Sequence, residues 1–424
     1  MSEFPEALRR RLARPAAVFG GGVSGQAVAA SLASAGFASV IYDEKGDNPD
    51  FGPAEAARHD LLVYSPGFAQ SHPWLLAARR AGLMCLTELD FGALLWTGPA
   101  LAVTGTNGKT TLTEFLSFAF KRSGQDAVAC GNVGLPLTTL HRTVSNGSFL
   151  AVVEVSSFQA EDLRHFTPEA VLWTNFDEDH LDRHGDLESY FRAKYKLIER
   201  MMPGGILVVG ESVVAAARRF GIELPPEAIV ATRAAAADTV PAGSMFDTWP
   251  QRENWAVASC YWQARGLAPR LLEEAARIFR PAPHRLRKVA EGQGVEFWND
   301  SKGTNFHAVE AALAQFGVPV RWIGGGKWKG GDLAAFAARI APRIEAAYLI
   351  GETAPELLRH FEALGRPARA FASLQDAVVA AAKDAHGPTA ILLSPGFSSF
   401  DMFRGYAERG TVFERAAQAL AQRN

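Results

Sequence analysis

The sequence predicts an α/β protein made of three tandem α/β domains. Short apolar strands alternate with helical segments along the chain, which is typical of parallel sheets joined by crossover helices. Two glycine-rich turns, at residues 20–25 and 105–111, each lie between a predicted strand and a predicted helix. A chain of 424 residues is also longer than a single hydrophobic core usually supports.

The strand–helix pattern begins three times along the chain. Residues 1–97 contain the strands AAVFG, ASVIYDE and DLLVYS, and residues 98–282 contain LAVTG, FLAVVEVSS, AVLWTNF and GGILVVG. Residues 283–424 contain VEFWND, VRWIGGG, AAYLIGE and TAILLSP, with a helix expected over DLAAFAARIAPRI. The alanine-rich stretch at 231–243 is expected to be a loop or a mobile helix. The predicted domains are therefore 1–97, 98–282 and 283–424.

The composition is that of a globular protein without a strong overall charge. The net charge is −2, so we expect no partner among nucleic acids and no binding to an anionic membrane. Cys85, Cys130 and Cys260 are widely spaced and odd in number, which indicates buried thiols in a reducing compartment. The N-terminus is too charged for a secretory signal, and no apolar run approaches the length of a membrane span. We expect a cytoplasmic monomer.

The first glycine turn contains Gly20, Gly22 and Gly25, and Asp43 ends the next predicted strand. Glycines at these positions allow a tight turn and let the backbone approach a diphosphate at a helix N-terminus. Taken alone, the pattern is typical of NAD(P) or another diphosphate nucleotide. Glycine is also common here for packing, so a purely structural role stays open.

The second turn, in LAVTGTNGKTT, resembles a phosphate-binding loop but is short. Only two residues separate Gly105 from Gly108, whereas the general pattern has four between its glycines. A helix N-terminus offers free N–H groups to a phosphate, Lys109 adds a positive charge, and Thr110 supplies a hydroxyl for Mg²⁺. The alternative is a strand–helix turn that contains Gly-Lys-Thr by chance.

Carboxylates that could hold a magnesium ion follow in the same predicted domain. Glu154 comes at the end of a buried strand, where a charge requires a partner, although a salt-bridged structural carboxylate is the alternative. The segment TNFDEDHLDRHG at 174–185 is rich in Asp and His just after another buried strand. His180 is the best candidate there for a second metal position, and a solvated acidic loop is the alternative.

A series of motifs resembles the Mur ligase family over nearly the whole chain. They are VTGTNGKTT, GNVGLP, EVSSFQ, TNFDEDHLDRHG, AKYK, PHR, NDSKGTN, GGKWKGGD and LSPGFSSFDMF, in the order typical of that family. The resemblance implies an N-terminal Rossmann-like domain that binds a UDP-sugar and a central P-loop ATPase-like domain that binds ATP. It also implies a C-terminal Rossmann-like domain that brings the amino acid.

The resemblance also implies roles for individual residues. The UDP-sugar would contact Gly22, Val23, Ser24, Asp43, Lys45, Gly67 and Asn132. ATP would contact Gly105, Thr106, Asn107, Gly108, Lys109, Thr110, Thr111, Asn254, Arg285 and Asp300. Two Mg²⁺ ions would be held by Thr110, Glu154, His180 and Lys194, with Lys194 carbamylated. The amino acid would contact Lys302, Thr304, Lys329, Ser399 and Tyr406. Lys109, Lys194 and His180 would be the catalytic residues.

The implied activity is an ATP-dependent amide ligase that acts through an acyl phosphate in peptidoglycan precursor synthesis. Its substrates would be UDP-N-acetylmuramoyl-L-alanine and D-glutamate. A sister ligase that adds L-glutamate or another amino acid is an alternative within the family. An NAD-binding oxidoreductase and a non-catalytic nucleotide-binding regulator are alternatives of other classes, but neither explains Lys109, Glu154, His180 and Lys194 together.

Overall fold

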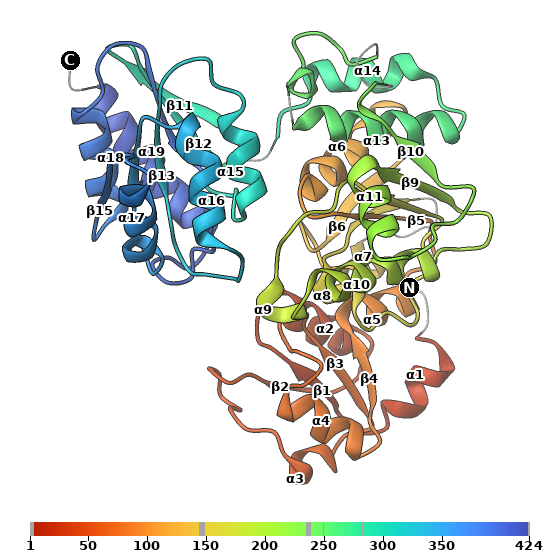
Figure 1. Cartoon of the computed structure of the whole chain (residues 1–424). Helices are drawn as coiled ribbons and strands as arrows, with labels where there is room; N and C mark the ends of the chain where they lie inside the picture. The colour runs from red at the N-terminus through yellow and green to blue at the C-terminus, as the bar shows by residue number, and fades with distance from the viewer. Residues whose placement is uncertain (1–3, 144–148, 235–238, 249, 282, 423–424) are drawn as a thin grey trace. The chain divides into compact units, whose positions relative to one another are not determined.

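The computed structural model describes residues 4–143, 149–234, 239–248, 250–281 and 283–422, and contains three sheets (Figure 1). The expected α/β architecture with parallel sheets is confirmed. Part of the alanine-rich stretch at 231–243 lies outside the described residues. By packing, the chain forms two compact units. The first comprises Met1–Phe176, Glu188–Ser244 and Glu253–Phe279, and the second Asp177–Leu187, Met245–Arg252 and Arg280–Asn424.

The first sheet is parallel and has the strand order β2-β1-β3-β4. Its strands are β1 (Ala16–Phe19), β2 (Ser39–Tyr42), β3 (Leu61–Tyr64) and β4 (Met84–Thr87). Its helices are α1 (Glu6–Arg11), α2 (Val23–Ser34), α3 (Pro53–Ala56), α4 (Pro73–Arg80) and α5 (Glu88–Leu95). Because all strands run the same way, the turns after β1, β2 and β3 meet at one edge, where the UDP-sugar residues are expected.

The second sheet is also parallel, with the order β10-β9-β8-β5-β7-β6. Its strands are β5 (Ala100–Thr104), β6 (Ala127–Gly131), β7 (Leu150–Glu154), β8 (Ala170–Trp173), β9 (Ile206–Gly210) and β10 (Ile229–Ala231). Its helices are α6 (Lys109–Arg122), α7 (Leu137–Thr143), α8 (Ser157–Ala160), α10 (Leu187–Glu199), α11 (Glu211–Arg219), α13 (Gln251–Ala264) and α14 (Pro269–Ile278). Strands β5 and β7 are buried along their whole length, as their apolar sequences predict.

Helix α5 joins the first two sheets within the first unit. The carboxylate of Glu88 accepts a hydrogen bond from the backbone N–H of Thr138 (3.0 Å), at the start of α7. The carboxylate of Asp90 accepts three from the backbone of residues 164–166 (2.9–3.0 Å). A side chain at Gly92 would place its Cβ 2.6 Å from the backbone nitrogen of Thr138. Buried carboxylates that bond backbone N–H groups therefore fix this junction.

The third sheet, in the second unit, has the order β11-β12-β16-β13-β14-β15 and is parallel except for the β11–β12 pair. Its strands are β11 (Arg287–Gly292), β12 (Val295–Asn299), β13 (Val320–Gly324), β14 (Ala346–Leu349), β15 (Ala368–Ala370) and β16 (Thr389–Leu393). Its helices are α15 (Phe306–Leu313), α16 (Leu333–Ile340), α17 (Ala354–Ala363), α18 (Leu374–Lys383) and α19 (Tyr406–Ala421). The second unit also contains α9 (Leu181–His184) and the 3-10 helix Met245–Asp247.

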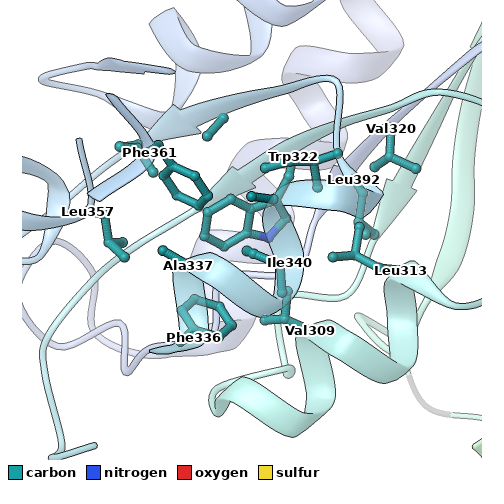
Figure 2. Packing of buried hydrophobic residues seen from close by; sticks show 14 of the residues in the cluster. Val309, Leu313, Val320, Trp322, Phe336, Ala337, Ile340, Leu357, Phe361 and Leu392 are labelled. Carbon is teal, nitrogen blue, oxygen red and sulfur yellow. The ribbon is translucent and has the colours of Figure 1, made fainter. Parts of the chain in front are cut away.

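The core of the second unit lies on both faces of the third sheet. On one face Trp322 packs against Phe336 and Phe361, with ring centroids 5.9 Å apart in each pair (Figure 2). Helices α15, α16 and α17 supply that cluster, and α18 and α19 supply the cluster on the other face. The expected helix over DLAAFAARIAPRI is α16 followed by a 3-10 turn, Ala341–Arg343, because a proline occupies the second position of that turn.

Candidate active site

The predicted phosphate loop is a tight turn between β5 and α6 that requires glycine at two positions. Gly105 has φ +149° and Gly108 has φ +81°, and a Cβ at either would overlap a neighbour. At Gly105 it would lie 1.9 Å from Oγ1 of Thr174, and at Gly108 it would lie 2.2 Å from Oδ1 of Asn254. The two residues between the glycines are held by Asn175, which accepts the backbone N–H of residue 106 (3.0 Å) and of residue 107 (2.8 Å). The short loop therefore has a defined conformation, held by hydrogen bonds from its own backbone to Asn175.

Two lysines converge on one carbonyl oxygen of this loop. Nζ of Lys109 donates to the carbonyl of Gly105 (2.9 Å) and to that of Thr106 (2.8 Å). Nζ of Lys194, on α10, donates to the same Gly105 oxygen (2.8 Å) and lies 4.8 Å from the ring centroid of Tyr190. Lys194 is only 1% exposed. The structure therefore concentrates positive charge at the N-terminus of α6, where the helix end already favours anions.

Glu154 ends β7 beside this loop and is buried. Its Oε1 accepts a hydrogen bond from Nδ2 of Asn132 (2.7 Å), which follows β6. Its Oε2 is buried and has no hydrogen-bond partner among the described residues. A buried carboxylate oxygen without a donor is unfavourable unless a cation occupies its surroundings, and Mg²⁺ prefers such hard oxygen ligands. The hydroxyl-bearing Thr110 is buried in the first turn of α6. The donor set of this unit therefore fits a magnesium ion.

The remaining predicted ATP residues are divided between the units. Asn254 is buried in α13 against Gly108, in the first unit, and Thr111 is buried in α6. Arg285 and Asp300 belong to the second unit. The carboxylate of Asp300 accepts the backbone N–H of residue 286 (3.1 Å) and the hydroxyl of Ser394 (2.7 Å), and burial raises its pKa to about 7.

The N-terminal glycine turn lies at the carboxyl edge of the first sheet and is partly exposed. Asp43 accepts the backbone N–H of Gly21 (2.5 Å) and of Lys45 (2.9 Å), and these hydrogen bonds lower its pKa. A Cβ at Gly25 would lie 1.8 Å from the carbonyl oxygen of Gly20, so this turn also requires glycine. Among the predicted UDP-sugar residues of this edge, Gly22, Val23, Lys45 and Gly67 are exposed, and Ser24 and Asp43 are half-buried.

The second unit contains a small pocket with a buried ion pair. Nζ of Lys329 lies 2.7 Å from Oδ1 of Asp179, and Nδ2 of Asn305 donates to its Oδ2 (3.1 Å). Burial would raise the pKa of Asp179, but the positive charges of Lys329 and His180 hold it well below its usual range. The pocket brings together Thr304 and Lys329, two of the predicted amino-acid residues.

The other predicted amino-acid residues belong to the same unit but do not line this pocket. Nζ of Lys302 lies 5.1 Å from the ring centroid of Tyr406, a cation–π contact. Ser399 is buried, and its carbonyl accepts the backbone N–H of Phe403 (2.8 Å). The sequence did not indicate these partners, because they depend on how the loops pack.

The predicted metal residues do not fall in a single unit. Thr110, Glu154 and Lys194 belong to the first unit. His180 belongs to the second, where it directly precedes α9 with φ +54°, and its Nε2 lies 3.6 Å from Oδ2 of Asp179. Within the described ranges no group of three or more His, Cys, Asp or Glu side chains is arranged to hold a metal. The second metal position remains a prediction.

Sequence reasoning missed three residues that organise these loops. Asp179 pairs with Lys329, Asn305 donates to Asp179, and Asn175 holds the phosphate loop. A signal for the first existed, because Asp179 directly precedes His180 in an acidic segment after a buried strand. Asn175 and Asn305 lie in the quoted motifs TNFDEDHLDRHG and NDSKGTN, but neither motif indicated which groups they bind.

The fold and the loop define the class of protein first: an α/β protein with three sheets, a short glycine-rich turn of the kind that binds phosphate, and a buried carboxylate beside it. Residues 103–231 match the Mur ligase middle domain, and residues 284–397 match the Mur ligase glutamate ligase domain. A UDP-N-acetylmuramoylalanine–D-glutamate ligase of Gloeobacter violaceus is 33% identical, covering 96% of this chain and 99% of that protein. One of Nitrobacter hamburgensis is 33% identical, covering 95% of this chain and 96% of that protein. The MurF ligase of Thermotoga maritima, solved with ADP, shares the fold with a TM-score of 0.59 at 16% identity, covering 86% of this chain and 96% of that one.

The chain belongs to the Mur ligase family. This membership favours a ligase over the two alternatives of other classes, the nicotinamide oxidoreductase and the binding-only regulator. Within the part of the chain that the structure describes, every helix is too short or too polar to cross a membrane.

Proposed function

We propose that this chain is an ATP-dependent ligase that joins D-glutamate to UDP-N-acetylmuramoyl-L-alanine in peptidoglycan precursor synthesis. Two relatives named UDP-N-acetylmuramoylalanine–D-glutamate ligase match this chain over nearly their whole length. The structural observation that carries the proposal is the tight glycine turn at Gly105 and Gly108, which places Lys109 in the first turn of α6. A positive charge at a helix N-terminus suits a polyphosphate.

The reaction needs activation because a carboxylate is a poor electrophile. When bound, ATP supplies a phosphoryl group and Mg²⁺ supplies positive charge beside it. An oxygen of the substrate carboxylate would attack the γ-phosphorus of ATP, and ADP would leave, which gives an acyl phosphate. The neutral amine of D-glutamate would then attack the acyl carbon, phosphate would leave, and the nitrogen would lose a proton to give the amide. In this scheme Lys109 and the first N–H groups of α6 hold the phosphates and offset the charge that develops on the transferred group.

Two magnesium positions are proposed. Thr110 and Glu154 would hold the first ion, and the buried Oε2 of Glu154 supports this assignment. His180 and a carbamylated Lys194 would hold the second. His180 belongs to the second compact unit, and Lys194 to the first.

Carbamylation of Lys194 is proposed on electrostatic grounds. Two ammonium groups that contact one carbonyl oxygen repel each other, and the repulsion is stronger when one of them is buried. The neutral amine of Lys194 would add to the carbon of CO₂ and lose a proton, which gives a carbamate with one negative charge. That change replaces the repulsion by attraction to Lys109 and supplies an oxygen ligand for a cation.

The substrates are proposed to bind at two further places. The UDP-sugar would lie at the carboxyl edge of the first sheet, on the exposed turns at Gly22 and Gly67, and reach Asn132. D-Glutamate carries two carboxylates, which Lys302 and Lys329 would bind, with Thr304, Ser399 and Tyr406 around them. Since Lys329 now pairs with Asp179, a substrate carboxylate would share that ammonium group.

The proposed functional domains are 1–97 for the UDP-sugar, 98–282 for ATP and 283–424 for the amino acid. We further propose that the protein acts as a cytoplasmic monomer. Sedimentation equilibrium of the purified chain tests the monomer, because a mass near twice 45.7 kDa would contradict it.

The proposal is tested by phosphate release from ATP with purified protein, UDP-N-acetylmuramoyl-L-alanine and D-glutamate. Phosphate release should require all three substrates, and omission of any one should abolish it. Release that does not depend on the sugar nucleotide or on the amino acid, or no release at all, would contradict the ligase. Replacement of D-glutamate by L-glutamate tests the stereochemistry, and the D-isomer alone should support release.

A further inference from the structure

A fully buried arginine lies behind the amino-acid end of the proposed site. Arg409, in α19, is only 1% exposed. A guanidinium group removed from water loses much solvation free energy, which must be offset by hydrogen bonds or by paired charge. Its hydrogen bonds all go to a hydroxyl and to backbone carbonyls. The buried guanidinium therefore stabilises the arrangement of the chain segments that carry these acceptors.

The guanidinium of Arg409 joins two loops that are far apart in sequence. Nε donates to the hydroxyl of Ser301 (3.1 Å) and Nη2 to the Ser301 carbonyl (2.9 Å). Nη1 donates to the carbonyl of Phe397 (3.2 Å). The Ser301 hydroxyl in turn donates to the carbonyl of Tyr406 (2.7 Å) at the start of α19. One side chain therefore fixes the loop after β12, the loop after β16 and the beginning of its own helix.

A third loop packs against the same guanidinium. Gly326 follows β13, and a Cβ there would lie 3.4 Å from Nη1 of Arg409 and 2.3 Å from the carbonyl oxygen of Ser398. Residue 327 pairs with Ser398 through reciprocal backbone hydrogen bonds (2.9 and 3.2 Å). The position of the chain that leads to Lys329 thus depends on the loop that Arg409 holds.

These three loops carry the residues proposed to bind D-glutamate. Ser301 directly precedes Lys302, Phe397 lies two positions before Ser399, and Gly326 lies three positions before Lys329. A shift of any loop would move one carboxylate-binding group relative to the others, and binding that depends on several groups at once is sensitive to shifts of this kind.

We propose that Arg409 is a positioning residue that sets the spacing of the three amino-acid-binding loops, and so determines the affinity for D-glutamate without contacting it. The identity of the ligand, D-glutamate, rests on the proposed function. The contacts of Arg409 with the loops do not depend on it. Burial lowers the pKa of Arg409 to about 10, partly opposed by the negative charges of Asp401 and Asp300. The group therefore keeps its charge and all its donors at neutral pH.

The test compares Arg409→Lys with Arg321→Lys. Lysine keeps the charge but has a single donor group, which cannot bridge Ser301 and Phe397 in the fork geometry of a guanidinium. Arg321 is the matched control because it is also buried, at 6% exposure, and donates to Tyr348 (2.7 Å) and Glu345 (3.1 Å). Both variants lose a buried guanidinium of the same unit.

We expect Arg409→Lys to raise KM for D-glutamate about tenfold or more and KM for ATP by a smaller factor, because Asp300 of the same loop is proposed to contact ATP, with KM for the sugar nucleotide unchanged. Arg321→Lys should leave all three KM values unchanged, even if it lowers the melting temperature by as much as Arg409→Lys does. An equal rise of all three KM values in the Arg409 variant, or the same rise for D-glutamate in the control, would overturn the proposal.

Hydrogen–deuterium exchange without substrates separates this inference from the proposed function. In Arg409→Lys, amide exchange should be faster than in the wild type in all three loops, residues 300–305, 326–331 and 396–400. In Arg321→Lys, exchange in these loops should match the wild type. This result decides the loop contacts even if the wild-type chain shows no ligase activity. Arg409→Gln serves as the second variant, and unchanged exchange in all three loops of a folded Arg409 variant would overturn the proposal.

Discussion

The ammonium group of Lys329 lies 2.7 Å from Oδ1 of Asp179, and both side chains are largely buried. The two residues are far apart in sequence, in segments that the sequence places in different predicted domains. Their contact joins the acidic loop of His180 to the loop that is proposed to bind an amino acid. It also places a carboxylate beside the ammonium group that is proposed to bind a substrate carboxylate.

Asp179→Asn should lower the free energy of unfolding of the second unit by about 3–5 kcal/mol, because Lys329 would keep a buried charge without its partner. Urea unfolding followed by tryptophan fluorescence measures the change. Glu310→Gln is the control, since Glu310 forms an exposed pair with Arg339 that should contribute less than about 1 kcal/mol. Equal losses in the two variants would show that the Asp179 pair does not stabilise the unit.

Glu154→Gln should lower the ligase rate about a hundredfold or more, because the proposed magnesium ion loses a negative ligand. The fold should be no less stable, since glutamine can still accept from Asn132 and removes a buried charge. The rate and the melting temperature are measured together. Glu169→Gln is the control, because that carboxylate lies on the same unit but is 42% exposed and pairs with Arg265. A variant with full activity would contradict the metal assignment.

Lys194→Ala should abolish ligase activity, and short carboxylates such as acetate or formate should restore part of it by supplying the missing oxygen ligand. Lys196→Ala is the control, because Lys196 is exposed on the same helix and pairs with Glu199 at 2.8 Å. That variant should retain its rate and should not respond to added carboxylate. Absence of rescue in Lys194→Ala at any carboxylate concentration would count against carbamylation while leaving the ligase proposal in place.

Asp300 should make stability depend on pH in a defined window. Burial raises its pKa from 3.8 to about 7, so the folded state keeps a proton that the unfolded state has already lost. The contribution of protonated Asp300 to the free energy of unfolding is fully present below pH 4, where the unfolded chain also holds the proton. It falls as the pH rises towards 7 and is lost above that value, where Asp300 is ionised in both states. Its size is about 4 kcal/mol at most, because a pKa difference of one between the folded and unfolded states corresponds to about 1.4 kcal/mol.

The comparison of wild type with Asp300→Asn isolates this contribution. The difference in free energy of unfolding between the two proteins, measured by urea titration from pH 4 to pH 8, should change in that window and stay constant above it. A difference that does not vary with pH would show that Asp300 is ionised throughout in the folded protein.

Much of the fold was predictable because the strands are apolar and the turns between them contain glycine. β1, β5, β7, β9, β13 and β16 lie where their apolar sequences predict. β4, β6, β10 and β15 were not predicted; β10 and β15 have only three residues each, and β6 (AVACG) consists mostly of small residues. β11 was missed because it is an exposed edge strand rich in charge. Charged residues are tolerated in β11 because it lies at the edge of its sheet, and a local sequence pattern does not show that a strand will be at an edge.

By itself the sequence determined the α/β class, the two glycine turns and the residues that the Mur ligase motifs carry. Those features are local, since a glycine that must adopt positive φ or a lysine that follows it is visible in a few consecutive residues. Only the tertiary structure decided that Lys109 and Lys194 meet at Gly105, that Asp179 binds Lys329, and that Arg409 joins three loops. Each of these depends on contacts between segments that are distant in sequence, where packing and the need to satisfy buried polar groups select the partners.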